Sequence, residues 1–292
     1  MKMRIPLFII LLFITVSGFR FHASNIKDGG AKTDFILATI NIRYPTKKDS
    51  VNYWEYRKKQ MIDFVNDANL DIVCFQEVSL SQLNYLEESL TDYSFAGNKI
   101  RKVKGEGYKP ILYRKKVFTC LDEGTFWLSE TPDSVGSKGW DGKHSRRATW
   151  AKLKSRKTGK SFCVVNTHLD NVGKVARQKG MELIKRRLKS TSDSIPVVLC
   201  GDMNCSSSST TYRSALNDEF MMNDAYQVAK VRKGVSYSFH RFGKNPVEKR
   251  GMIDFIFVTN QFEVKYIYIP KEEKRNGSYL TDHCPVVTNL CF

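Results

Sequence analysis

A short apolar run in this chain ends in two polar side chains that could perform chemistry. Residues 197–200 (V-V-L-C) form an unbroken apolar run, which is typical of a strand buried on both faces. Gly201 follows, and because it has no side chain the backbone can turn tightly or approach a neighbour there. Asp202 and Asn204 then lie on the same side of an extended backbone. They could bring a carboxylate and a hydrogen-bond donor to the rim of a sheet, although an ordinary turn uses the same residues.

Polar residues stand at the ends of other apolar runs in the same way. Asn41 closes residues 34–42, Glu77 closes residues 71–77, and an N-T-H-L-D segment closes residues 161–169. The complete set is Asn41, Glu77, His168, Asp170, Asp202, Asn204, Asp254, Asp282 and His283. Any one of them has a simple structural alternative, such as a turn cap, a surface ion pair or a buried, hydrogen-bonded histidine. Their joint occurrence predicts that the fold brings them to one sheet edge.

The elements that would position these residues fall into two kinds. Buried strands over 34–42 and 71–77 alternate with amphipathic helices over 54–69 and 80–90. Shorter, glycine-interrupted segments follow at 111–113, 117–120 and 125–128, which is typical of antiparallel strands. The later elements are a hairpin of 148–153 and 161–169, a helix over 172–188, a short helix at 212–216 and a strand over 252–259. Residues 280–287 then carry the Asp282–His283 pair just before the last strand. This order predicts one α/β domain, a four-layer α/β/β/α sandwich in which two packed sheets are flanked by helices.

The N-terminus has the pattern of a cleavable secretory signal. Lys2 and Arg4 precede an apolar run over residues 5–16, and small residues follow. The run is short for a membrane span, so an uncleaved anchor is the lesser alternative. We therefore expect a signal peptide at 1–24, a domain at 25–292, and a secreted or periplasmic protein. The seven cysteines include no zinc-site spacing, and we interpret them as structural.

The formal charge of the 292-residue chain is +17. Such a charge favours polyanions, phosphorylated substrates or anionic membrane surfaces as partners, and says nothing about the fold. The lysines and arginines are spread over several segments, including 101–104, 152–160, 185–189 and 271–275. A diffuse basic surface is more often a solvated face than a reader of specific sequences. Nothing in the chain implies an obligate protein partner, and we expect a monomer.

Six ordered motifs give the chain a family resemblance that runs from about Phe35 to the C-terminus. They are T-I-N-I (39–42), F-Q-E-V (75–78), N-T-H-L-D (166–170), G-D-M-N (201–204), M-I-D-F-I-F-V (252–258) and T-D-H-C-P-V (281–286). In this order they resemble the endonuclease/exonuclease/phosphatase superfamily, which includes deoxyribonuclease I. The segments G-Y-K-P-I-L-Y-R-K (107–115) and G-T-F-W-L-S-E-T-P (124–132) are similar to its secreted bacterial branch, nearest the nocturnin-like deadenylases.

The resemblance implies a role for most of the polar set. Glu77, with Asn41 and Asp282, would hold Mg²⁺ or Mn²⁺, ions that prefer hard oxygen ligands. Asp202 would activate the attacking water, and Asn204 and His168 would donate hydrogen bonds to the phosphoryl oxygens. His283 would bind the phosphate from the other side, held and kept protonated by Asp254.

Two substrate contacts are also implied, and one departure from the family pattern stands out. Arg146 would grip a substrate phosphate, with Arg147 an equally plausible surface residue beside it. Asp170 would serve the substrate or a second metal. Abasic-site enzymes have an Asp two residues after the first-motif Asn, where this chain has Arg43. That difference puts a second metal ligand there in doubt and, with export, moves the prediction away from DNA repair.

The predicted function is therefore a secreted, Mg²⁺-dependent phosphoesterase that cleaves phosphodiester bonds in DNA or RNA. A sphingomyelin or phospholipid phosphodiesterase is the first alternative, and the apolar triplet Phe126-Trp127-Leu128 could supply its membrane contact, although core packing is the commoner use of such a triplet. A sugar- or inositol-phosphate phosphatase is the next. An inactive phosphate- or polyanion-binding module is disfavoured, because every acid and imidazole of the set is present.

Overall fold

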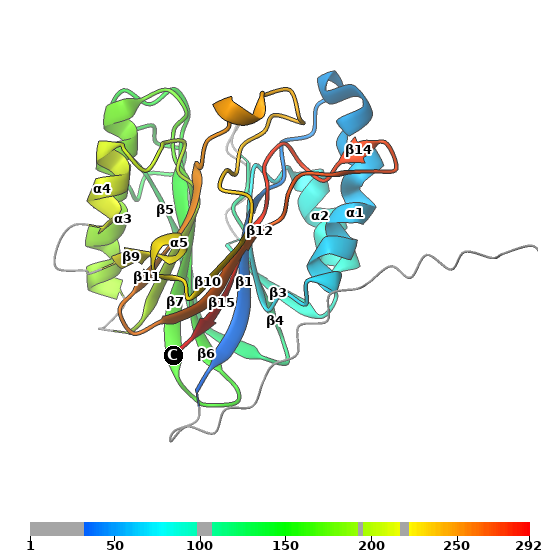
Figure 1. Cartoon of the computed structure of the whole chain (residues 1–292). Helices are drawn as coiled ribbons and strands as arrows, with labels where there is room; N and C mark the ends of the chain where they lie inside the picture. Colours follow the sequence, from blue (N-terminus) through cyan, green and yellow to red (C-terminus); the bar gives the residue numbers. More distant parts are fainter. Residues whose placement is uncertain (1–31, 98–106, 192–194, 217–221) are drawn as a thin grey trace, which may run out of the picture. The chain divides into compact units, whose positions relative to one another are not determined.

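Two β-sheets lie face to face, and helices cover their outer faces (Figure 1). The computed structural model describes residues 32–97, 107–191, 195–216 and 222–292. The predicted signal peptide at 1–24 and the basic segment 101–104 lie outside these residues. The predicted sandwich of two packed sheets flanked by helices is confirmed.

The strands form a seven-stranded sheet, a six-stranded sheet and a small hairpin. In spatial order the first sheet contains β10 (Val231–Gly234), β12 (Glu263–Ile269), β15 (Val286–Cys291), β1 (Asp34–Asn41), β2 (Ile72–Gln76), β4 (Ile111–Arg114) and β3 (Tyr93–Ala96). The second contains β5 (Phe118–Trp127), β6 (Arg147–Ser155), β7 (Ser161–His168), β8 (Val197–Asp202), β11 (Asp254–Thr259) and β9 (Met222–Asp224). The hairpin consists of β13 (Lys274–Arg275) and β14 (Ser278–Tyr279).

The helices divide between the two sheets. The α-helices are α1 (Trp54–Asp67), α2 (Leu80–Ser89), α3 (Lys174–Thr191), α4 (Thr210–Leu216) and α5 (Ala225–Val228), and the 3-10 helices are η1 (Lys47–Asn52) and η2 (Val247–Lys249). Met61 of α1 and Leu86 of α2 belong to the apolar cluster on the outer face of the seven-stranded sheet. Ile184 of α3 and Tyr212 of α4 belong to the corresponding cluster on the six-stranded sheet.

Strand β1 shows why the central strands read as continuous apolar runs. Phe35 and Leu37 point into the core between the sheets, whereas Ala38 and Ile40 point toward the helices. Side chains alternate across a strand, so a strand covered on both faces needs apolar residues at every position. In the inter-sheet core the ring of Phe35 stacks on that of Phe162, with 4.9 Å between centroids.

The strand registers bring distant polar residues to one edge. Strands β1 and β2 are parallel, with Asn41 opposite Gln76, so Glu77 follows directly beyond the pair. Strands β7 and β8 are also parallel, with His168 opposite Asp202. Strand β11 runs antiparallel to β8 and begins with Asp254 opposite Asp202. The carboxyl ends of the parallel strands therefore meet at the rim where the sequence predicted a site.

One expectation for the middle of the chain is wrong. The segments expected at 117–120 and 125–128 form one strand, β5, with a register shift between Cys120 and Asp122. Gly124 does not break the strand; a side chain there would lie 2.6 Å from the indole nitrogen of Trp150, so the glycine permits close packing. The triplet Phe126-Trp127-Leu128 is buried in the core, which is the commoner use of such a triplet, and it does not form an exposed apolar hairpin for membrane contact.

Two further observations concern the cysteines and the helices. All seven cysteines fall within the described residues and none of them forms a disulfide bond, with only Cys120 partly exposed. Among the helices of the described residues, none is long and apolar enough to cross a membrane.

Candidate active site

The polar residues from both sheets meet around the carboxylate of Asp202. Its Oδ1 accepts a hydrogen bond from the Asn204 backbone N–H at 2.9 Å, and its Oδ2 accepts from Asn41 Nδ2 at 3.1 Å. The same Oδ2 lies 3.3 Å from His168 Nε2 and 3.9 Å from His283 Nε2. Burial and the nearby Asp254 carboxylate raise the pKa of Asp202 to about 7. A carboxylate placed in this way can accept a proton near neutral pH.

The backbone around Asp202 explains the glycine and the asparagine of the G-D-M-N motif. A side chain on Gly201 would lie 1.9 Å from the Thr167 carbonyl oxygen, so only glycine allows β8 to approach β7 this closely. Asn204 adopts the left-handed conformation with φ 48°, which asparagine tolerates better than most residues. Its amide nitrogen lies 2.9 Å from His168 Nε2 and donates to the Leu169 carbonyl at 3.0 Å. Asn204, His168 and Asp202 therefore form one connected group.

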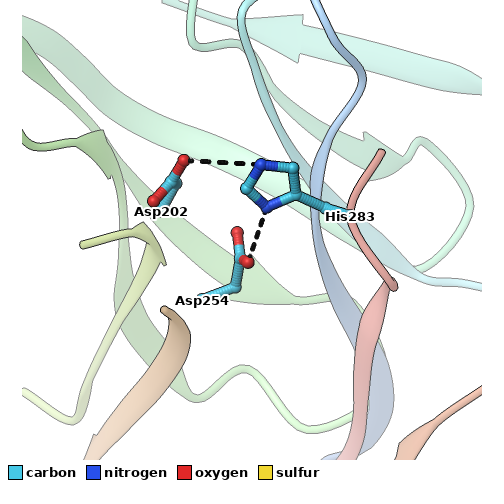
Figure 2. A group of neighbouring side chains, drawn as sticks. All are labelled: Asp202, Asp254 and His283. Carbon is cyan, nitrogen blue, oxygen red and sulfur yellow. Dashed lines mark hydrogen bonds and ion pairs between the residues drawn. The ribbon is translucent and has the colours of Figure 1, made fainter. Parts of the chain in front are cut away.

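His283 is oriented by Asp254 and faces Asp202 (Figure 2). Its Nδ1 lies 2.8 Å from Asp254 Oδ2, and Nε2 points toward Asp202. Burial opposes protonation of the imidazole, but Asp254, Asp202 and Asp282 outweigh it and raise the pKa of His283 to about 10. The ring of Phe239 packs against the imidazole at 4.9 Å between centroids. His283 is thus held as an imidazolium with a fixed orientation.

Glu77 and Asp282 gather on the side of the site formed by the seven-stranded sheet. Glu77 Oε1 accepts a hydrogen bond from Asn41 Nδ2 at 3.3 Å, and Oε2 accepts from the Tyr44 backbone N–H at 2.9 Å. Burial opposes ionisation of Glu77, but the Tyr44 hydrogen bond and the charge of His283 outweigh it and lower its pKa. Burial raises the pKa of Asp282, and the nearby Glu77 carboxylate adds to that effect.

These acids fit a hard divalent cation. Because the Glu77 carboxylate helps to raise the pKa of the buried Asp282, a positive charge between the two acids would stabilise them, and carboxylate and amide oxygens are the ligands that Mg²⁺ prefers. In the present geometry the Asn41 amide directs its nitrogen at Glu77 and Asp202, while its oxygen accepts from Arg43 N at 2.9 Å. Ligation through that oxygen therefore requires the amide to turn.

A second set of possible ligand atoms is less suitable for a cation. One ligand atom from each of Asp202, Asp254 and His283 lies within 4.8 Å of the others. However, the Nδ1 atom of His283 is engaged with Asp254, and a protonated imidazole cannot ligate a metal. Glu77, Asn41 and Asp282 are therefore the better candidates for binding a cation. Asp202, Asp254 and His283 are better suited to accepting and donating protons.

Asp170 and Arg146 lie beside His168 rather than within the cluster. Asp170 accepts hydrogen bonds from the backbone N–H groups of His144, Val172 and Gly173 at 2.7–2.9 Å. These bonds outweigh the opposing effect of burial and lower the pKa of Asp170 to about 2. Arg146 Nε lies 3.8 Å from Asp170 Oδ2. Asp170 thus anchors the loop that carries Arg146, and its predicted contact with substrate or metal stays a prediction.

Arg43 occupies the position where abasic-site enzymes carry an acid. Its guanidinium contacts Asp49 at 3.1 Å, and its Nε lies 3.9 Å from Asp282 Oδ2. A cation therefore stands where the family pattern of those enzymes would place a carboxylate ligand, in line with the doubt raised by the sequence.

Sequence reasoning missed several buried cations that shape the site. Arg57 of α1 is fully buried and donates to the backbone carbonyls of Asn52, Leu280 and Arg43, so it ties together loops that flank Glu77 and Asp282. Burial lowers the pKa of Arg57 to about 10. Lys109 and Arg147 are also buried, and Arg147 precedes Ala148, which pairs with Thr167 next to His168. The sequence signal that could have located Lys109 and Arg147 was their position within the segments K-P-I-L-Y and H-S-R-R-A-T-W.

Comparisons with known proteins give one family and several similar structures. A model of the Endonuclease/Exonuclease/phosphatase family matches residues 38–283. An endonuclease/exonuclease/phosphatase from Bacteroides vulgatus is 45% identical, with a TM-score of 0.84 over 88% of this chain and 98% of that chain. A mannosyl-6-phosphatase from Bacteroides thetaiotaomicron is 31% identical, with a TM-score of 0.80 over 88% of this chain and all (100%) of that one.

A curated relative gives a more distant match. Nocturnin from Drosophila melanogaster is 26% identical over 189 residues, which is 61% of this chain. The matched part spans only 28% of that relative's length.

Proposed function

The chain belongs to the Endonuclease/Exonuclease/phosphatase family, and we propose that it hydrolyses phosphate esters at the site around Asp202 with the help of Mg²⁺ or Mn²⁺. Phosphoric ester hydrolysis is the activity of the family. The observation that supports this site most directly is the position of Asp202 between two imidazoles, 3.3 Å from His168 and 3.9 Å from His283. Asp202 can accept a proton, and the imidazoles of His168 and His283 can stabilise negative charge on either side of it.

In the proposed reaction a water molecule attacks phosphorus and transfers a proton to Asp202. The pKa of about 7 makes this carboxylate a stronger base than an exposed aspartate, while Asn41 and Asn204 fix its orientation. The bond from phosphorus to the leaving oxygen then breaks. As charge builds on the phosphoryl oxygens, the imidazolium of His283 stabilises it from one side and the Asn204–His168 pair from the other.

The divalent cation would be held by Glu77, Asp282 and Asn41. When bound there, it would polarise the phosphoryl group and neutralise charge on the leaving oxygen. The part played by the chain is to keep Glu77 ionised through the Tyr44 hydrogen bond and to keep the loops around it in place through Arg57.

A phosphorylated small molecule, such as a sugar phosphate, is our first candidate substrate. The mannosyl-6-phosphatase similarity supports it, because that relative is 31% identical and its whole length is matched. The burial of the reacting groups also favours a small ester. Asp202, Asp254 and His283 expose only 1–6% of their surface, so a terminal phosphate can enter more easily than a continuous polymer backbone.

Nucleic acid is the second candidate, as the sequence predicts. The observation that favours it is the formal charge of +17, since a basic surface attracts polyanions. Cleavage of DNA or RNA would then weaken steeply as salt is raised. A phospholipid substrate loses its main support, because the apolar triplet proposed for membrane contact is buried.

Export remains part of the proposal. A basic start followed by a short apolar run supports cleavage near residue 24 and a secreted or periplasmic location. Sequencing the N-terminus of the protein recovered from outside the cytoplasm tests it. A mature N-terminus between residues 18 and 26 is expected, and an intact Met1 would contradict export by cleavage.

A substrate panel tests the proposed function. Sugar phosphates, inositol phosphates, sphingomyelin, DNA and RNA would be incubated with the protein and Mg²⁺, beside Asp202→Ala and His283→Ala. We expect release of inorganic phosphate from sugar phosphates and its loss in both variants. Cleavage of nucleic acid alone would favour the second candidate, and equal activity of variants and parent would eliminate the site.

A further inference from the structure

Two buried amides join the two sheets close to the site. Gln76 comes from β2 of the seven-stranded sheet and Asn166 from β7 of the six-stranded sheet, and both are completely buried. Gln76 Nε2 donates to Asn166 Oδ1 at 2.7 Å and to Thr39 Oγ1 at 2.9 Å. Asn166 Nδ2 donates to the backbone carbonyls of Phe75 and Pro110 at 2.8 and 3.0 Å. We call Gln76 and Asn166 the amide bridge.

The hydrogen bonds fix the direction in which both amides point. Backbone carbonyls can only accept, so the Asn166 nitrogen must face them and the Asn166 oxygen must face Gln76. The Gln76 nitrogen then has to face Asn166, and it lies 3.0 Å from the Cys74 carbonyl as well. Gln76 Oε1 is left buried, with no hydrogen-bond partner in the part of the chain that the structure describes.

This arrangement is a poor device for stability. A buried acceptor without a partner is unfavourable, and a pair of apolar side chains of the same shape can replace a buried hydrogen bond at little loss. The residues around the amide bridge, such as Cys74, Val164 and Cys200, belong to the apolar core between the sheets. What amides add to such a core is a fixed geometry, because hydrogen bonds are directional and apolar contacts are not.

The amide bridge lies one step along the strands from the reacting groups. Side chains two residues apart on a strand share a face and lie about 6.5 Å apart. Asn166 therefore shares its face of β7 with His168, which stands opposite Asp202 on β8. On the other sheet Gln76 directly precedes Glu77. The amide bridge thus connects the strand that leads to the proposed cation site with the strand that carries one of the imidazoles.

The site's own link between its acids is weaker. Asn41 Nδ2 donates across the sheets to Asp202 Oδ2 at 3.1 Å and to Glu77 Oε1 at 3.3 Å. These two bonds share one nitrogen and fall at the long end of the usual range, whereas the Gln76–Asn166 bond is 2.7 Å. The distance between the two acids is therefore held more firmly below the site than within it.

We propose that Gln76 and Asn166 are positioning residues, which set the distance between the cation site at Glu77 and the proposed base Asp202. The proposal rests on the phosphoesterase function proposed above and adds two residues to that reaction. A phosphate under attack must be held from both sheets at once, and a displacement of about 1 Å can lower a rate ~10²-fold. Either side can still bind a phosphate by itself, so loss of the amide bridge should affect the reaction more than substrate binding.

Steady-state kinetics of Gln76→Met test this role. Methionine keeps the length of the side chain and removes its hydrogen bonds. We expect kcat on the best substrate to fall about 10–100-fold while KM stays within ~3-fold of the parent, at a temperature where the variant is fully folded.

Val164→Ala is the matched control, because it removes apolar bulk from the same core on β7 without touching the amide bridge. It should lower the melting temperature at least as much and leave kcat within ~2-fold of the parent. An equal fall in kcat in both variants would show that Gln76 acts through stability, and would overturn its positioning role.

Binding of Mg²⁺ and inorganic phosphate gives a readout that needs no hydrolysis. Each should raise the melting temperature of the parent, and a phosphate that contacts both sheets should bind more tightly when the cation is present. Mg²⁺ should lower the phosphate concentration needed for a given rise by ~10-fold in the parent and by less than ~3-fold in Gln76→Met. The rise caused by phosphate without Mg²⁺ should be the same in both proteins.

The two measurements separate failure of this inference from failure of the proposed function. A parent that hydrolyses phosphate esters, with kcat or the Mg²⁺–phosphate coupling unchanged in Gln76→Met, would overturn the positioning role and leave the function in place. A parent that hydrolyses none of the esters, with the coupling lost in Gln76→Met, would contradict the function and support the positioning role. If Gln76→Met does not melt cooperatively, Gln76→Leu takes its place in both measurements.

Discussion

The site consists of two unlike halves, each gathered at the edge of one sheet. The acidic half consists of Asn41, Glu77 and Asp282 at the edge of the seven-stranded sheet, and the imidazole half consists of His168, Asp202, Asn204, Asp254 and His283. In the imidazole half, side chains contact one another directly, as in the 2.8 Å pair of His283 and Asp254. In the acidic half, backbone donors hold the carboxylates, as Tyr44 N holds Glu77. The imidazole half is therefore assembled by the chain alone, whereas the acidic half carries like charges that a cation would balance.

The adjacent residues Asp282 and His283 illustrate the division. Asp282 faces Glu77 and Arg43, whereas His283 reaches across to Asp254 on the other sheet. One short loop before β15 thus connects the two halves. We expect changes in the imidazole half to lower the rate of reaction directly and changes in the acidic half to alter the demand for metal.

The largest expected effect comes from the centre of the imidazole half. Asp202→Asn should lower kcat by about 10³–10⁴. The substitution removes the proposed general base, which typically contributes about 10²–10⁴ in rate, and it also weakens the stabilisation of charge around the base. The measurement is steady-state hydrolysis of the best substrate, with circular dichroism as a control for folding. Extra Mg²⁺ should not restore the rate. A loss of less than tenfold would remove Asp202 from its proposed role.

A smaller loss is expected at the His283–Asp254 pair. His283→Ala and Asp254→Asn should each lower kcat by about 10²–10³. Since Asp254 acts by orienting and charging His283, the double variant should be no more than ~3-fold worse than His283→Ala. Rates of the two single variants and the double variant check this. Losses that multiply would show that Asp254 acts independently of His283.

The acidic half should respond through metal dependence. Glu77→Gln should raise the Mg²⁺ concentration needed for half-maximal activity by roughly 10–100-fold, because a neutral amide replaces an anionic ligand. Titrating Mg²⁺ against the hydrolysis rate measures the shift, and Asp202→Asn serves as the comparison, with no shift expected. An unchanged Mg²⁺ requirement in Glu77→Gln would remove the distinction between the two halves.

The smallest effect concerns Asp170, which lies outside both halves. Its pKa is lowered to about 2, so it stabilises the fold above the ordinary pKa near 3.8, and that contribution disappears as the pH falls toward 2. Asp170→Asn should therefore lower the free energy of unfolding by roughly 1–2 kcal/mol at pH 7, with the difference shrinking between pH 4 and pH 2. Denaturant melts at several pH values measure it, with Asp67→Asn, an exposed acid, as the control. A difference that is constant with pH would rule out the charge as its cause.

Strand ends were predictable from the sequence, but the contacts between them were not. An apolar run followed by an acid or amide located Asn41, Glu77 and Asp202, since burial of both faces leaves a clear pattern. The pairing of Asp202 with Asp254 depends on the register between β8 and β11, which no local pattern encodes. Register of this kind is a property of the assembled sheet.

Buried cations were the other limit of sequence reasoning. Lys109 and Arg57 look like surface residues, because lysine and arginine are rarely buried. Their burial follows from close contacts made by distant segments, such as Gly107 against the backbone of Glu77. The strand β5 was split for a related reason, because Gly124 suggested a break while the indole of Trp150 requires a glycine there.

Hydrolysis in water enriched in ¹⁸O tests the central claim most directly. If water activated by Asp202 attacks phosphorus, mass spectrometry of a phosphomonoester reaction should find one ¹⁸O atom in each released inorganic phosphate and none in the alcohol. The Asp202→Asn protein should release labelled phosphate about 10³–10⁴-fold more slowly than the parent. Label in the alcohol, or labelled phosphate at an equal rate from Asp202→Asn, would contradict the account.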